Sequence, residues 1–226
     1  MVINNNHENR GSAYLAFMYK MPEFTETDSA EILAFMKAHP FVTLIASANS
    51  RPVATQVPVL IEERDGKVLL RAHIMRKTDH HLAIEQNPDV LILFQGAHCY
   101  VSSSWYTEKM GATWNYQTVH ARGTVKWLDE AGTVNAVRDL MNKYESGQEK
   151  PLFVEHLPDG YVAHMVKAIV GFEMEVTDTF AIFKLSQNRD DESYKNIVKH
   201  LQATNDTDAH KVANELMRRR PTLFNT

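Results

Sequence analysis

The chain has 226 residues, 44% of them hydrophobic and 23% charged, and its formal net charge is −4. This composition is typical of a folded globular protein, and a mildly acidic chain lacks the general basic charge that non-specific nucleic-acid binding requires. Cys99 is the single cysteine, so no intrachain disulfide can form. This fits a protein of the reducing cytoplasm. Because the sequence shows neither a signal-peptide pattern nor an apolar run of ~20 residues, we expect a cytoplasmic protein without a membrane partner.

The first third of the chain predicts a helix followed by paired strands. Residues 27–40 predict a helix, because Asp28 stands at a capping position, apolar residues fall on one face, and Pro40 ends the pattern. Strand-like runs follow at 41–48 and 51–63. Asp65 and Gly66 lie between two further strand-like runs, which predicts a hairpin turn.

The middle of the chain predicts more strands and three helices. We expect strands at 89–96, 99–103, 118–128 and 170–187, a loop at 102–113, and helices at 77–88, 129–145 and 161–169. Many strands with hairpin turns and few intervening helices favour a mainly β fold. We therefore predict an antiparallel barrel with helices on its outside.

The composition changes after Gln187. Two amphipathic helices are predicted at 190–203 and 207–220, so we expect a barrel domain at 1–188 and a C-terminal helical segment at 189–226. The second helix ends in three arginines, which favourably meet the helix dipole. Contact with DNA through a helix-turn-helix is the alternative, although Asp208 and Glu215 interrupt the basic face that a recognition helix normally presents.

Common catalytic and metal motifs are absent from the sequence. It contains no G-x-G-x-x-G, P-loop, G-x-S-x-G, H-E-x-x-H or C-x-x-C pattern. The adjacent His80 and His81 point in different directions on a helix or a strand, so we expect no metal site. Cys99 has no nucleophile signature, and we expect a structural thiol.

A first candidate site lies where a strand gives way to a helix. Alternation puts Arg71 and His73 on one strand face, and Arg76, Lys77 and Thr78 follow near the helix N-terminus. Cations, a hydroxyl and backbone N–H groups could together hold a phosphate. The alternative is a solvated strand end whose charges point into water.

A second candidate is the segment "YVSSSWYTEKMGATWNYQTVHARG" at 100–123. Its aromatic rings could form a wall for a flat ligand, and its hydroxyl and amide groups could bond the polar edge of that ligand, although such mixtures also occur in cores. The rings belong to Tyr100, Trp105, Tyr106, Trp114 and Tyr116, and the polar groups to Ser102, Ser104, Thr113, Asn115 and Gln117.

A third and weaker candidate is "KLSQN" at 184–188. Lys184, Ser186 and Gln187 could face a ligand at the end of the last strand. Asn188 could instead cap the next helix.

Together, "FQGAHCYVSSSWY", "TWNYQTVHARG", "GFEMEV" and "FKLSQN" resemble the PaiB family, described as FMN-binding negative transcriptional regulators with a split β-barrel fold. The resemblance covers about residues 14–215. It implies that FMN is the cofactor and that it binds at a homodimer interface, with its phosphate near the strand-to-helix turn.

The resemblance also assigns site residues by motif. The matched positions are His73 and Arg76, with Lys77 and Thr78 just after; Ser102, Ser104, Trp105 and Tyr106; Thr113, Trp114, Asn115 and Tyr116; and Lys184, Ser186 and Gln187. Ser103 and Ala112 stand where the family usually has proline, and Met75 and Lys77 replace small residues. Fewer prolines leave this loop less preorganised.

Three functions are compatible with this resemblance. The first is a flavin-binding regulator that contacts DNA. The second is an FMN-dependent oxidoreductase using NAD(P)H, in which His73, Tyr116 or Lys184 would be a polarising group near the flavin ring. The third is a haem-binding or haem-degrading split barrel, in which His73, His98 or His120 ligates iron.

Overall fold

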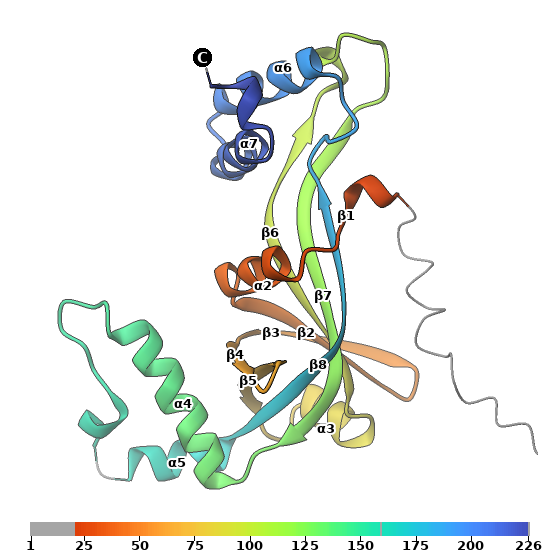
Figure 1. Cartoon of the computed structure of the whole chain (residues 1–226). Helices are drawn as coiled ribbons and strands as arrows, with labels where there is room; N and C mark the ends of the chain where they lie inside the picture. Colours follow the sequence, from red (N-terminus) through yellow and green to blue (C-terminus); the bar gives the residue numbers. More distant parts are fainter. Residues whose placement is uncertain (1–20, 159, 226) are drawn as a thin grey trace, which may run out of the picture. The chain divides into compact units, whose positions relative to one another are not determined.

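The computed structural model describes residues 21–158 and 160–225. Its strands form a mainly antiparallel sheet of eight strands in the order β3-β2-β6-β7-β8-β5-β4, with β1 paired to β8 (Figure 1). β3 and β4 end this path, so the sheet is open. The strands are β1 Thr25–Glu26, β2 Phe41–Ala48, β3 Arg51–Pro58, β4 Leu60–Arg64, β5 Lys67–Met75, β6 Asp89–Val101, β7 Thr113–Trp127 and β8 Ile169–Lys184.

Helices flank the sheet, as predicted. The α-helices are α2 Ser29–Ala38, α3 Asp79–Gln86, α4 Glu130–Glu145, α5 Tyr161–Ala168, α6 Asp191–Gln202 and α7 Thr207–Arg219. Short 3-10 helices are η1 Pro22–Phe24, η2 Ser103–Trp105, η3 Val154–His156 and η4 Pro221–Leu223. Among the described residues, none of these helices has the length and apolar character that crossing a bilayer would need.

The described residues divide into two compact units. We call residues 28–96 and 118–179 the central unit, and residues 21–27, 97–117 and 180–225 the terminal unit. The strands β6, β7 and β8 each contribute residues to both units, and α6 and α7 belong to the terminal unit. The domain boundary predicted at residue 188 stays a prediction.

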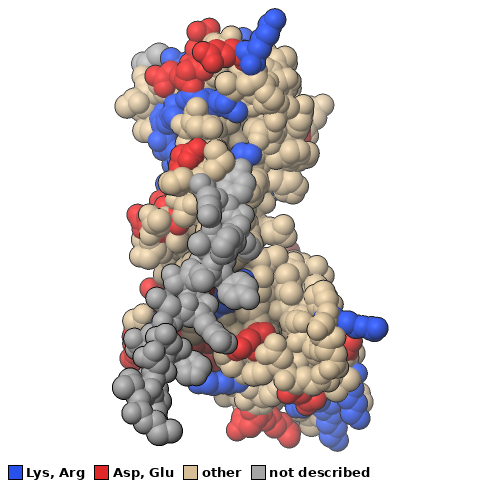
Figure 2. Space-filling model, turned by 90° about the vertical axis from the view of Figure 1, so that its right-hand side faces the viewer, with Lys and Arg blue, Asp and Glu red and all other residues tan. Residues whose placement is uncertain are grey.

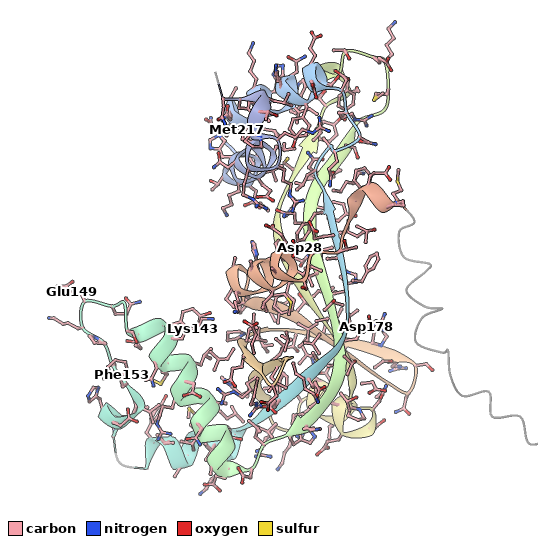
Figure 3. All side chains as sticks on the ribbon, viewed as in Figure 1. Asp28, Lys143, Glu149, Phe153, Asp178 and Met217 are labelled. Atoms are coloured by element: carbon pink, nitrogen blue, oxygen red, sulfur yellow. The ribbon has the colours of Figure 1, made fainter. Side chains whose placement is uncertain are left out.

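Local sequence signals set the helix start and the hairpins as expected. Asp28, labelled in Figure 3, caps α2 by accepting hydrogen bonds from the N–H groups of Ala30 at 2.8 Å and Glu31 at 3.3 Å. Asp65 and Gly66 have φ values of 54° and 75° and join β4 to β5. Positive φ at both central residues is the backbone that a tight hairpin turn requires.

Several strand boundaries differ from the prediction. The strand expected at 170–187 is β8, Ile169–Lys184. The strand expected at 51–63 breaks into β3 and β4 at Val59, which is buried and donates its N–H to the Pro40 carbonyl at 2.8 Å. The strands expected at 89–96 and 99–103 are one strand, β6. β7 begins at Thr113, five residues before the predicted start. The prediction missed this part because its inward-facing residue, Asn115, is polar, so the segment shows no alternation of apolar residues.

Each unit has its own apolar core. Leu44, Leu70, Phe94 and Phe172 are fully buried in the central unit, on β2, β5, β6 and β8. In the terminal unit the buried positions include Leu185, Tyr194, Ile197, Val212 and Leu216, most of them on α6 and α7. Burying one large apolar side chain contributes roughly 1.5–3 kcal/mol, so each unit holds its strand ends and helices in fixed positions.

Candidate functional site

The turn between β5 and α3 is held in one conformation by hydrogen bonds. We call Arg76, Lys77 and Thr78 the basic turn. Lys77 has a φ of 62°, in the left-handed region that non-glycine residues rarely adopt. The Arg76 N–H donates to the Ala168 carbonyl at 2.8 Å. The Thr78 hydroxyl caps α3 by accepting from the His81 N–H at 3.3 Å and donates to the Met75 carbonyl at 3.1 Å. Thr78 therefore shapes the turn, and its hydroxyl is already engaged.

Arginine 71 is committed to an ion-pair cluster in the central unit. Its guanidinium donates to a Glu62 carboxylate oxygen, and to Asp139 at 2.8 Å. Burial alone would lower the pKa of Arg71, but the hydrogen bonds and charges of Asp139 and Glu62 outweigh it, and the net effect raises the pKa. The structure thus gives Arg71 a role in joining β4, β5 and α4, and its predicted contact with a cofactor stays a prediction.

The other cations of the β4–β5 hairpin are also neutralised. Arg64 pairs with Glu173 at 2.7 Å and Lys67 with Glu175 at 3.0 Å. Arg76 and Lys77 differ, because neither side chain has an acidic partner among the residues that the structure describes. The basic turn therefore presents two cations without an ion pair within the described residues, beside the N-terminus of α3, where the helix dipole is positive and Asp79 is the first residue.

His73 lies on the same face of β5 as Arg71, as alternation predicted, while Ala72 and Ile74 point into the core. Burial lowers the pKa of His73, so the imidazole is neutral at pH 7. A neutral ring can donate one hydrogen bond and accept another. His73 can therefore orient a polar group, but it adds no charge to a phosphate site.

The aromatic segment does not form one continuous wall in the terminal unit. Trp105 stacks on His200 of α6, with ring centroids 5.0 Å apart and planes 6° apart. Trp114 is instead 53% exposed and lies 6.0 Å from the rings of both His98 and Tyr100. Trp114 and Tyr100 form an exposed pair on β7 and β6, whereas Trp105 packs against a helix.

Alternation along β7 separates the predicted ring contacts from the predicted polar contacts. Trp114 is exposed, and the next residue, Asn115, is fully buried. Thr113 shares the face of Asn115, and Tyr116 shares that of Trp114. The structure therefore assigns these four positions to two faces of one strand.

The serines of the segment are engaged locally. Ser102 caps η2 by accepting from the Ser104 N–H at 3.2 Å, and the two hydroxyls lie 2.9 Å apart. Gln187 is engaged in the same way, because its amide accepts from the Leu185 N–H at 2.7 Å and donates to the Phe183 carbonyl. These three side chains stabilise turns, and their predicted contacts with a cofactor stay predictions.

Thr113, Asn115 and Lys184 do come together. They line a pocket of about 170 Å³ in the terminal unit, which we call the β7–β8 pocket. The Lys184 ammonium donates to the Thr113 hydroxyl at 2.6 Å, and the Ser186 hydroxyl donates to Asn115 Oδ1 at 3.0 Å. Ser186 has a φ of 58°. Sequence reasoning missed three of the lining residues, Met21, Phe24 and Arg189, because they lie outside the motifs.

The candidate metal and haem ligands lie in different environments. Among residues 21–158 and 160–225, no three His, Cys, Asp or Glu side chains are grouped to hold a metal ion. Burial lowers the pKa of His120, and the nearby charge of Arg122 lowers it further. His98 is exposed and lies 3.9 Å from Asp208. The thiol of Cys99 is buried, as a structural cysteine would be.

The three C-terminal arginines are paired within the terminal unit. Arg218 and Arg219 both donate to Glu215, at 2.8 and 2.7 Å. Arg219 also reaches Glu26, at 3.1 Å. Arg220 donates to the Gln187 carbonyl at 2.6 Å and to Asp191 at 3.2 Å. Figure 2 likewise shows Lys and Arg side chains close to Asp and Glu side chains on the face that it displays.

Comparison with known proteins connects these features to a family. Residues 18–178 match the family model described as "Putative FMN-binding domain". The chain is 33% identical over 200 residues to the "Protease synthase and sporulation protein PAI 2" of Bacillus subtilis, a match that covers 88% of this chain and 96% of that protein.

Solved structures with the same fold have low sequence identity to the chain. The flavocytochrome Anf3 from Azotobacter vinelandii has a TM-score of 0.60 at 15% identity, covering 79% of this chain and 78% of that one. The FAD and haem binding protein from Mycobacterium smegmatis has a TM-score of 0.52 at 11% identity, covering 71% and 73%. These likenesses confirm the split-barrel fold class. Together with the family match and the Bacillus relative, they lead to one conclusion: the chain is a split-barrel member of the PaiB family of FMN-binding proteins, and FMN is the cofactor that the family supports.

Proposed function

We propose that this chain binds FMN with the phosphate at the basic turn. The observation that carries the proposal is that, within the described residues, the cations of the β4–β5 hairpin form ion pairs and those of the basic turn do not. Arg64, Lys67 and Arg71 all have carboxylate partners, whereas Arg76 and Lys77 have none among the described residues. A phosphate carries negative charge and acceptor oxygens, and it would complete this turn as acids complete the rest of the hairpin.

The residues at the turn would divide the work of holding FMN. Arg76 and Lys77 would bind the phosphate, and Thr78 would hold the turn in shape through its cap. His73, neutral at pH 7, would donate a hydrogen bond to a polar atom of the ligand without adding charge. The bound flavin would supply the electron-transfer chemistry, and the chain would supply binding and orientation.

We further propose a cytoplasmic homodimer with the flavin site at its interface. The exposed pair Trp114 and Tyr100 of the terminal unit supports the dimer, because large exposed aromatic rings are enriched at protein interfaces. The two rings are 53% and 50% exposed. Sedimentation of the natural chain and of Trp114→Ser tests the proposal: a dimer that the substitution weakens supports it, and a monomeric natural chain contradicts it.

The biological role that we propose is transcriptional regulation, as in the family that the chain resembles. Contact with DNA through α6 and α7 is the weaker part, because Arg218, Arg219 and Arg220 are already paired with acids or carbonyls. A gel-shift assay with neighbouring genomic DNA at stated salt tests it. Retardation no greater than that of an acidic control protein would contradict DNA binding.

An FMN-dependent oxidoreductase is the second candidate; it needs no contact with DNA, against which the internal pairing of those arginines counts. The test is bleaching of the bound flavin by NADH or NADPH under anaerobic conditions. Reduction within seconds to minutes would support an enzyme. A flavin that neither donor reduces would contradict this form of the proposal.

The phosphate assignment is tested by titrating the protein with FMN and with riboflavin, which lacks the phosphate. We expect FMN to bind more tightly. Arg76→Ala should weaken FMN binding by roughly 1.5–3 kcal/mol, the range for a hydrogen bond to a charged group, and leave riboflavin binding unchanged. Arg64→Ala is the matched control, because it removes an arginine of the neighbouring β4–β5 hairpin that already has a carboxylate partner. Equal FMN affinity in Arg76→Ala and the natural chain would contradict the assignment.

A further inference from the structure

The β7–β8 pocket of the terminal unit has the chemistry of a binding site that the FMN proposal does not use. It lies where β7 begins and β8 ends, and Asn115, Lys184, Ser186 and Arg189 line its polar side. Phe24, buried in η1, lines another side and supplies an apolar surface.

Asn115 presents a hydrogen-bond donor that nothing in the described part of the chain uses. The side chain is 0% exposed. Its Oδ1 accepts from the Ser186 hydroxyl at 3.0 Å, whereas its Nδ2 has no partner there. Buried amide groups are almost always paired, so an unpaired one in the wall of a pocket points to an acceptor supplied by a ligand.

The backbone near Asn115 is also held in an unusual conformation. Ser186 is buried and has a φ of 58°, a value that costs free energy in a non-glycine residue. In this conformation the Ser186 hydroxyl donates to Asn115 Oδ1. That bond orients the amide group, and its Nδ2 has no partner among the described residues. The wall of the pocket is thus held in place rather than loosely packed.

The charge of the pocket selects the ligand class. Its described lining includes two cations, Lys184 and Arg189, and no acid. The Lys184 ammonium donates to Thr113 and lies 5.7 Å from the centroid of the Phe24 ring, and two of its three N–H donors have no hydrogen-bond partner among the described residues. Arg189 stacks over the ring of Tyr106 at 4.5 Å, and its buried Nε has no partner within the described chain. Asn115, Lys184 and Arg189 therefore each have an N–H donor that a negatively charged acceptor could use.

Asp190 follows Arg189 in the chain, but it does not neutralise these donors. The carboxylate of Asp190 accepts from the Ser193 N–H at 2.8 Å and from the Thr107 hydroxyl at 3.1 Å. It is engaged as the cap of α6 and does not line the pocket.

The volume of the pocket limits the size of the ligand. Pockets for drug-sized ligands measure about 300–1,000 Å³, and the β7–β8 pocket, at about 170 Å³, is smaller. This space suits a carboxylate with a short chain. We propose that the β7–β8 pocket binds a small aliphatic monocarboxylate, with its oxygens on Lys184 and Asn115 and its chain on Phe24.

Titration with sodium butanoate, followed by the NMR signals of the Asn115 side-chain amide, tests this proposal. Sodium chloride controls for ionic strength, and butanamide has the same chain without the charge. We expect a saturable shift of the amide signals with butanoate alone. Lys184→Met should weaken butanoate binding by about tenfold or more, as loss of a charge-assisted hydrogen bond would. Lys195→Met is the matched control, because Lys195 is exposed on α6.

Each outcome decides for or against the monocarboxylate site. A shift that rises linearly and equally with sodium chloride, equal binding of butanamide, or unchanged affinity in Lys184→Met would overturn it. FMN is added last. If FMN displaces butanoate competitively and Lys184→Met weakens FMN binding, the pocket belongs to the flavin site and the proposal is overturned. Because the basic turn is tested separately through Arg76→Ala, failure of one proposal leaves the other standing.

Discussion

Replacing Arg71 with leucine tests whether the structure or the motif describes this residue correctly. Arg71 joins Glu62 of β4 and Asp139 of α4 to β5. Its side chain is 17% exposed, whereas those of Glu62 and Asp139 are 37% and 43% exposed. If the residue supports the scaffold, Arg71→Leu lowers stability and leaves phosphate recognition intact.

The expected loss follows from these exposures. A hydrogen bond to a charged group contributes about 1.5–3 kcal/mol, while exposed ion pairs contribute about 0.2–1 kcal/mol. The mostly buried guanidinium argues for the first range and the partly exposed acids for the second. For two such contacts, less the gain from burying leucine, we expect the free energy of unfolding to fall by about 1–3 kcal/mol.

Urea unfolding at pH 7 measures this change, and Arg64→Leu is the control. Arg64 pairs with Glu173 but is 52% exposed, so its replacement should cost no more than about 1 kcal/mol. The same variants are titrated with FMN and riboflavin. If Arg71→Leu were as stable as the natural chain but no longer distinguished FMN from riboflavin, Arg71 would be a phosphate ligand and the scaffold role would be wrong.

Three further predictions concern the two units. Burial, with the charges of nearby acids, raises the pKa of Cys99 to about 12, so iodoacetamide at pH 8 should label this thiol only after unfolding; fast labelling of the native chain would contradict its burial. Hydrogen bonds from Ser193 lower the pKa of Asp190 to about 2, so the stabilisation that this cap gives α6 should be complete above the unfolded pKa of about 3.9 and disappear as pH falls to about 2. An NMR titration of the Asp190 carboxyl with a midpoint near 4 would refute this shift. A Cβ on Gly123 would lie 2.1 Å from the Glu175 carbonyl oxygen, so Gly123→Ala should destabilise the central unit by about 1–3 kcal/mol or more in urea unfolding; no change would mean that the strands separate easily there.

Local signals in the sequence were enough to predict most elements. Asp28 caps α2, and Asp65 and Gly66 turn the β4–β5 hairpin, because capping and tight turns depend on a few adjacent residues. The apolar faces of α6 and α7 follow from their periodicity in the same way. The early start of β7 was missed, because its inward residue there is the polar Asn115 rather than an apolar one.

The candidate site divides along the same line. The sequence by itself determined which chemical groups are available: the cations of the basic turn, the aromatic segment and the "KLSQN" motif, which together also indicated the family. Only the tertiary structure decided which of these groups are free to act. Arg71 and Arg219 are neutralised by acids distant in sequence, Asp139 and Glu26, whereas the Nδ2 of Asn115 is left without a partner in the described chain. Partners brought together by folding cannot be read from neighbouring residues, because each depends on how strands and helices far apart in the chain pack.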